Sequence, residues 1–108
     1  MHTLSDFPVR SIVPIQGIHV TRARDLLQRI ARDITPICRS RGWIIFTLRE
    51  IHPRDQSLLG MNIDCSEVQL RLRYGDDFLS YIEVMETALH ELAHMEIGPH
   101  NGAFFRLM

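Results

Sequence analysis

Hydrophobic positions in the first half of the chain recur at the spacing of a helix. After Thr21, a residue type that caps helix N-termini, apolar residues return every three or four positions. These residues are Leu26, Leu27, Ile30, Ile34 and Ile37. Gly42 suits a C-terminal cap, Pro36 should kink or tighten the last turn, and residues 1–20 lack the period. The pattern predicts an irregular N-terminal segment and then an amphipathic helix that starts near Thr21.

The middle of the chain has strand patterns instead. Residues 43–49 are β-branched or aromatic on both faces, which predicts a strand covered on both sides. Residues 58–63 form a second, shorter strand candidate. From Glu67 to Tyr74 apolar and polar residues alternate, which predicts a half-buried strand antiparallel to the one before it.

The last long element has the clearest boundaries. Ser80 and Glu83 form a capping box, and the helical pattern then continues to Ile97, where Gly98-Pro99 stops it. We therefore expect one domain over residues 1–108 with an α+β fold. In this fold a small, mainly antiparallel sheet packs against the first helix and the last one.

The composition is that of an ordinary globular domain. The chain has 108 residues, of which 45% are hydrophobic and 23% are charged. Its longest apolar runs span four or five residues, whereas about 20 are needed to cross a bilayer, so we expect no membrane partner. The start resembles no signal peptide. Cys38 and Cys65 lack the spacing of a zinc site and predict reduced thiols in a cytosolic or nuclear protein.

Charge is unevenly distributed although the net charge is −1. Residues 1–54 hold nine arginines and four acidic residues, and residues 55–108 hold three arginines and nine acidic residues. A solvated helix face explains the arginines of the first helix most simply. The alternative is that arginine forks hold phosphate groups, either on that helix or through Arg71 and Arg73.

Candidate chemistry lies in the last helix, in the run His90-Glu91-Leu92-Ala93-His94. Four residues correspond to about 400° of rotation, so the two imidazoles share a face about one turn apart and can reach one zinc ion. Glu91 is rotated about 100° from His90, which suits a hydrogen bond to a metal-bound water. The apolar side of the helix lies roughly opposite the histidines, so they should face a cleft or solvent.

A catalytic zinc site has three protein ligands and one open position, and His100 is the candidate for the third ligand. The histidines then stand at 0, +4 and +10, the spacing of the long metzincin pattern. The glycine is one place later than in that pattern, and no Met-turn follows. We expect Glu91 to act as general base on a water that zinc acidifies, and an extended substrate to pair with an edge strand at residues 58–63.

The site sequence resembles the WLM metalloproteases, relatives of Spartan that cleave proteins crosslinked to DNA. The resemblance extends over residues 22–108, and its most specific part is the Gly-Pro-His-x-x-x-Phe run from Gly98 to Phe104. Further landmarks are Arg-Gly-Trp at 41–43, Leu-Gly-x-Asn at 59–62, Leu-Arg-Leu-Arg at 70–73 and Phe-Leu at 78–79. The resemblance implies a minimal zincin-like fold, with zinc on His90, His94 and His100 and with Glu91 catalytic.

The same resemblance implies partners and a location. Members of the family act in the nucleus on DNA-crosslinked proteins and are stimulated by DNA, particularly single-stranded DNA. Their C-terminal tails commonly recruit SUMO-modified proteins and an AAA unfoldase. Because this sequence stops at Met108, inside an expected helix, we expect a C-terminally truncated domain without those tail-borne contacts.

Three other functions remain open from the residues. A metal-dependent endoribonuclease can have three histidines at the same spacing, although Glu91 stands where such enzymes typically have glycine. A non-catalytic DNA- or protein-binding module would hold structural zinc with four protein ligands. In the third alternative, the helix is a scaffold without metal.

Overall fold

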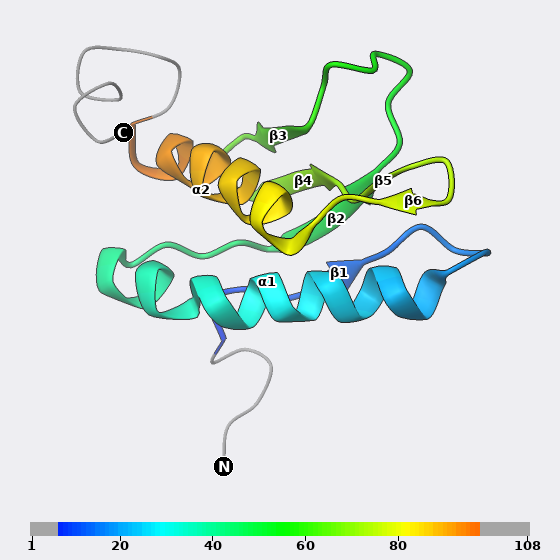
Figure 1. The fold of residues 1–108 in the computed structure, drawn as a ribbon. Helices are drawn as coiled ribbons and strands as arrows, with labels where there is room; N and C mark the ends of the chain where they lie inside the picture. Colours follow the sequence, from blue (N-terminus) through cyan, green and yellow to red (C-terminus); the bar gives the residue numbers. More distant parts are fainter. Residues whose placement is uncertain (1–6, 98–108) are drawn as a thin grey trace.

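The computed structural model describes residues 7–97, which form two long helices and short strands in an α+β arrangement (Figure 1). The α+β class is therefore as predicted. The helices are α1 (Val20–Arg41) and α2 (Tyr81–Ile97). The strands are β1 (Ile12–Val13), β2 (Thr47–Ile51), β3 (Gly60–Ile63), β4 (Glu67–Arg71), β5 (Arg73–Tyr74) and β6 (Asp77–Phe78).

The four-stranded sheet has the order β1-β2-β4-β3. The pairs β1–β2 and β2–β4 are parallel, and only β3–β4 is antiparallel. The expectation of a mainly antiparallel sheet is therefore wrong for this sheet. The reason is topological: α1 is a crossover between β1 and β2, and β4 inserts between β2 and β3. The antiparallel pairing of residues 60–63 with the strand after them is as predicted, and β5 and β6 form a separate hairpin.

Helix α1 differs from the prediction at its start and agrees with it at its end. The N-cap is His19 in the left-handed conformation (φ 63°), with no side-chain cap, so Thr21 is not the cap. Gly42 closes the helix at φ 70°, a conformation that glycine adopts without steric strain. The helix continues through Pro36 to Arg41.

The core lies between the sheet and both helices. Helix α1 packs on β1 and β2, whereas α2 packs on β3 and β4 (Figure 1). The fully buried aliphatic side chains come from all of these layers: Leu27, Ile30, Ile34, Ile45, Leu48, Val68, Leu70, Leu72, Val84 and Leu92.

The predicted strand at residues 43–49 is displaced toward the C-terminus. Sheet pairing begins at Thr47, and before it Ile45 forms only an isolated bridge with Val9. Ile44 and Phe46 are 40% and 59% exposed while Ile45 is buried, so this segment is covered on one face only. A run of apolar residues does not show by itself which face a neighbouring element covers.

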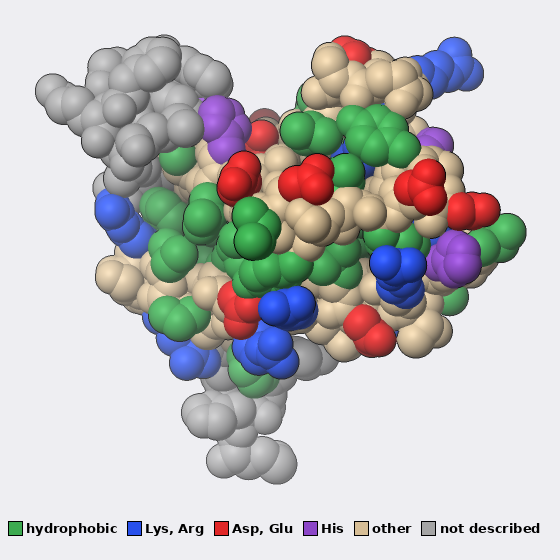
Figure 2. All heavy atoms as spheres, viewed as in Figure 1, with side chains coloured by type: hydrophobic (Ala, Val, Ile, Leu, Met, Phe, Trp, Pro, Cys, Tyr) green, Lys and Arg blue, Asp and Glu red, His purple; other side chains and the backbone are tan. Residues whose placement is uncertain are grey.

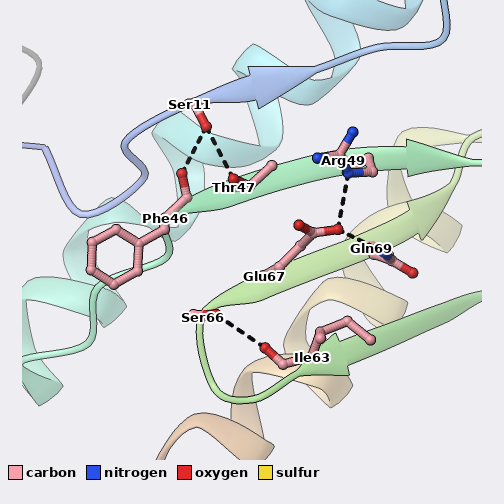
Figure 3. A network of polar contacts seen from close by, with 8 residues as sticks. All are labelled: Ser11, Phe46, Thr47, Arg49, Ile63, Ser66, Glu67 and Gln69. Atoms are coloured by element: carbon pink, nitrogen blue, oxygen red, sulfur yellow. Dashed lines mark hydrogen bonds and ion pairs between the residues drawn. The ribbon is translucent and has the colours of Figure 1, made fainter.

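The sheet face opposite the helices carries a polar network (Figure 3). Ser11 Oγ donates to the Phe46 carbonyl (2.7 Å) and to Thr47 Oγ1 (3.2 Å), which joins β1 to β2. Glu67 accepts from Arg49 Nε (2.9 Å) and from Gln69, and these bonds lower the pKa of its carboxyl, with the Gln69 bond contributing most. This face therefore crosslinks the central strands by polar contacts.

Arg71 and Arg73 contradict the expectation that the polar face of residues 67–74 is solvated. Their residues are 1% and 6% exposed. The segment before α1 folds over Arg73 and the loop before β3 folds over Arg71, so neither guanidinium is available for a DNA surface.

Both cysteines are free, as expected. Cys38 is buried, and burial raises the pKa of its thiol to about 11. Cys65 is exposed. Across the described part of the chain, neither helix has the length and apolar character needed to span a bilayer.

Candidate metal centre

Helix α2 is held in place at its first turn by the predicted capping box. The Glu83 N–H donates to Ser80 Oγ (3.2 Å), and the Ser80 N–H donates to Glu83 Oε1 (3.4 Å). The helix begins at Tyr81, as the sequence indicates, and extends to Ile97, the last described residue. These local bonds fix where the helix starts, and therefore which residues face the core.

The rotation of α2 agrees with its apolar pattern. Val84, Ala88 and Leu92 are buried against the core. His90 and His94 lie on a different side and are half-buried. Their ring centroids are 5.6 Å apart with an interplanar angle of 75°, so the structure brings these two predicted ligands together.

Glu91 lies where α2 meets the edge strand β3, and the residue is only 8% exposed. A Cβ atom added to Gly60 would stand 2.7 Å from Thr87 Cγ2, 2.8 Å from the Gln69 carbonyl oxygen and 3.4 Å from Glu91 Cγ. Only glycine lets the strand approach this part of the helix so closely. The position of Glu91 is therefore defined by β3 as well as by its own helix.

Asn62 ties the same strand to the helix backbone. Its Nδ2 donates to the Glu91 carbonyl (2.9 Å), and its Oδ1 accepts from the Cys65 N–H (3.0 Å). The sequence analysis did not assign this role to Asn62. The available signal was its spacing of two from Gly60, because residues two apart share one face of a strand.

Two hollows meet at His90, one on each side of α2. A hollow of about 280 Å³ lies toward β3 and is lined by Ser57, Leu59, Gly60, Glu86, Thr87, His90 and Glu91. A hollow of about 460 Å³ lies toward the end of α1 and is lined by Ile37, Arg41, Trp43, Glu86, Leu89, His90, Leu92 and Ala93. The first is bordered by Glu91, whereas the second has mainly apolar walls.

The donor set fits zinc as far as the structure describes it. Two neutral imidazoles on adjacent turns are ligands that zinc accepts. Within residues 7–97, no three His, Cys, Asp or Glu side chains form a group that could hold a metal. The third predicted ligand, His100, lies outside the described residues.

The arginines of α1 form a separate basic face. Arg22 lies over the Phe78 ring (4.4 Å to its centroid) and Arg29 over the Tyr81 ring (3.8 Å). The Tyr81 hydroxyl donates to Asp33, which lowers the pKa of that carboxyl and raises that of the phenol. Figure 2 shows basic and acidic side chains next to each other along α1, and acidic side chains over α2, on this side of the molecule.

Comparison with known proteins connects this arrangement to a family. The model of the WLM domain matches residues 9–108. The DNA-dependent metalloprotease WSS1 of Saccharomyces cerevisiae is 37% identical over 87 residues, which are 77% of this chain and 32% of that protein. The homologue in Schizosaccharomyces pombe is 33% identical over 96 residues, or 87% of this chain and 36% of that protein. The chain thus spans about a third of the length of the curated relatives it matches.

A solved structure has the same fold. The crystal structure of Wss1 from Saccharomyces cerevisiae gives a TM-score of 0.86 at 33% identity, covering 91% of this chain and 80% of that one. The likeness extends over both helices and the sheet, since it includes nine tenths of the chain.

Proposed function

Because the chain belongs to the WLM domain family, we propose that it is the catalytic domain of a zinc-dependent endopeptidase. Its substrates are proteins crosslinked to DNA, and its place of action is the nucleus. The observation that carries the proposal is the position of Glu91, held beside the edge strand β3 and next to the paired imidazoles of His90 and His94. The names of the relatives, which are DNA-dependent metalloproteases, support the same activity.

We assign the zinc ligands to His90, His94 and His100. A zinc ion bound there would polarise the scissile carbonyl and lower the pKa of a water molecule. The imidazoles of His90 and His94 are oriented for this role by a helix that is capped at Ser80 and packed against the core. His100 follows the helix after the Gly98-Pro99 stop.

Glu91 is the general base in this proposal. Its carboxylate accepts a proton from the attacking water and passes that proton to the departing amine nitrogen. Packing against Gly60 and the bond from Asn62 to its carbonyl restrict where the side chain can lie. A base held in one position loses little conformational entropy on reaching the transition state.

The substrate backbone pairs with β3. This strand is at the edge of the sheet, with β4 on one side and, within the described residues, no strand on the other. Edge strands present unpaired N–H and C=O groups to an extended peptide. A peptide added there passes the hollow of about 280 Å³ that Glu91 and His90 border.

We place the DNA contact on the basic face of α1. Arg22, Arg29 and Arg32 are exposed on that helix, and single-stranded DNA is the activator that we propose. Contacts with SUMO-modified proteins and an AAA unfoldase require segments outside this domain.

The test is the variant Glu91→Gln, compared with Asp76→Asn in the exposed turn between β5 and β6, which lines neither hollow at His90. Glu91→Gln should keep zinc, measured by elemental analysis, and lose cleavage of a denatured protein by at least about 100-fold, because an amide cannot take the proton. Asp76→Asn should retain most activity. Undiminished proteolysis by Glu91→Gln contradicts the mechanism, and zinc well below one equivalent contradicts the metal assignment. Cleavage of structured RNA in place of protein would favour the endoribonuclease alternative.

A further inference from the structure

Two buried arginines lie two residues apart along the chain, and the proposed mechanism uses neither. Arg71 ends β4 and is 1% exposed, and Arg73 begins β5 and is 6% exposed. A guanidinium buried to this extent is stabilised only if its donors find partners. The partners of the two arginines differ, and the difference points to a role for one of them.

The guanidinium of Arg71 donates its hydrogen bonds to backbone carbonyls rather than to carboxylates. Its Nε donates to the Leu58 carbonyl (3.1 Å), and one terminal nitrogen donates to the carbonyls of Pro53 (2.7 Å) and Asp55 (3.2 Å). The guanidinium also stacks on the Tyr74 ring, 4.2 Å from its centroid. The Tyr74 hydroxyl donates to the Gln56 carbonyl (2.6 Å). The side chains of Arg71 and Tyr74 thus bind four backbone carbonyls of the 52–59 loop.

This loop forms the wall of the hollow beside Glu91. Ser57 and Leu59 line the hollow together with Gly60, opposite His90 and Glu91. The Leu59 carbonyl accepts the backbone N–H of Arg71 (2.8 Å), so the anchor extends to the residue before β3. The loop has no helix or strand of its own. Bonds from Ser57 to the Asp55 carboxylate shape its turn, and the bonds from Arg71 and Tyr74 fix the loop to the sheet.

Arg73 provides the contrast. Its guanidinium pairs with the buried carboxylate of Glu50 (2.8 Å) and donates to the Ile18 carbonyl (2.7 Å). Those contacts hold the segment before α1, which does not line the hollow beside Glu91. Arg73 is therefore a natural control: a buried arginine near Arg71 that anchors a segment away from the cleft.

We propose that Arg71 is a positioning residue for the cleft. By holding the 52–59 loop it sets the distance from Ser57 and Leu59 to His90 and Glu91, and with it the fit of the substrate chain. The inference rests on the proposed peptidase function. Since Arg71 acts through the loop that lines the cleft, its loss should act mainly on substrate binding.

The experiment compares Arg71→Lys with Arg73→Lys in the zinc-loaded protein. A lysine keeps the positive charge, but its compact ammonium group lacks the planar guanidinium that lets arginine bind several separate loop carbonyls. Arg71→Lys should raise the KM for a peptide substrate by about tenfold, the scale of effect that a small misplacement produces, and change kcat by less than about twofold. Arg73→Lys should lower Tm and leave KM unchanged. Added guanidinium ion should restore the KM of Arg71→Ala. An equal KM in Arg71→Lys and Arg73→Lys would overturn the proposal.

A second readout is independent of activity. Amide hydrogen exchange in the 52–59 loop should become faster in Arg71→Lys and stay unchanged in Arg73→Lys. Unchanged exchange in Arg71→Lys rejects the positioning role even if the enzyme is active. If the wild-type protein has no peptidase activity but exchange in the 52–59 loop is faster in Arg71→Lys, the proposed function is rejected. The anchoring role of Arg71 is then still supported. If Arg71→Lys does not fold, Tyr74→Phe removes only the bond to Gln56, and it should raise KM and loop exchange to a smaller extent.

Discussion

The two sides of α2 differ in how closely they are packed. Toward β3 the contact is so close that a methyl group on Gly60 would meet Thr87 and the Gln69 carbonyl, and Asn62 bonds directly to the helix backbone. Toward α1 there is a hollow of about 460 Å³ with mainly apolar walls. Stacking of Arg29 on Tyr81 bridges the two helices nearer the start of α2.

The close packing corresponds to a requirement of the proposed chemistry. A general base must be held within a fraction of an ångström, which needs close packing and directional bonds. The proposed substrate passes β3 and the hollow of about 280 Å³ beside Glu91, so the wider hollow toward α1 has no part in the proposed catalysis. Variants that disturb the close side should therefore affect both the fold and catalysis, whereas variants on the α1 side should spare the fold.

The largest effect is expected from Gly60→Ala. The new Cβ would stand 2.8 Å from the Gln69 carbonyl oxygen of β4, and because that atom is backbone, β3 or β4 must shift. We expect a loss of about 2 kcal/mol in the free energy of unfolding, the usual scale of an overpacked site, together with reduced activity. Urea denaturation measures the first and peptide cleavage the second.

Leu89→Ala on the α1 side is the control for Gly60→Ala. Leu89 is 43% exposed, so its removal should change stability by less than about 0.5 kcal/mol. Adding Thr87→Ser to Gly60→Ala removes the atom at 2.7 Å and should restore part of the stability. If Gly60→Ala is as stable as the wild type, β3 does not pack closely on α2 in solution.

A smaller effect is expected from Asn62→Leu. The variant loses the bond to the Glu91 carbonyl and leaves the Cys65 N–H without the side-chain acceptor. The cost should be about 1–2 kcal/mol in unfolding free energy, the range for a partly buried hydrogen bond, and kcat should fall because Glu91 is less restricted. Asn62→Ser retains a small polar group and serves as the milder comparison. Unchanged stability and unchanged kcat in Asn62→Leu would mean that the bond has no role in holding Glu91.

The smallest effect on the fold is expected when Arg22, Arg29 and Arg32 are all changed to Gln. These side chains are exposed, so unfolding should change little. Affinity for single-stranded DNA should fall by about tenfold or more, and its salt dependence should weaken, because each lost phosphate contact removes about 0.7 from the slope. Fluorescence anisotropy at several salt concentrations measures both. The control changes Arg24, Arg39 and Arg54, three other exposed arginines, and keeps the net charge equal. Equal DNA affinity of the two triple variants would show that Arg22, Arg29 and Arg32 do not form the DNA-binding surface.

The sequence by itself determined the elements whose signals are local. The capping box at Ser80, the helical period up to Ile97 and the glycine cap at Gly42 each involve residues within about one turn, and the structure agrees at all three places. The relation of His90 to His94 follows from helical rotation alone. The edge position of the strand at residues 60–63 also agrees with the structure.

Only the tertiary structure decided what depends on distant segments. Alternation along β4 predicted a solvated Arg71, yet the 52–59 loop covers it and turns its guanidinium into an anchor. Parallel pairing of β2 with β4 follows from where β3 is placed, and the need for glycine at residue 60 follows from a helix that begins about twenty positions later. A periodic pattern shows which residues share a face. Which segment then covers that face depends on contacts between residues far apart in the chain.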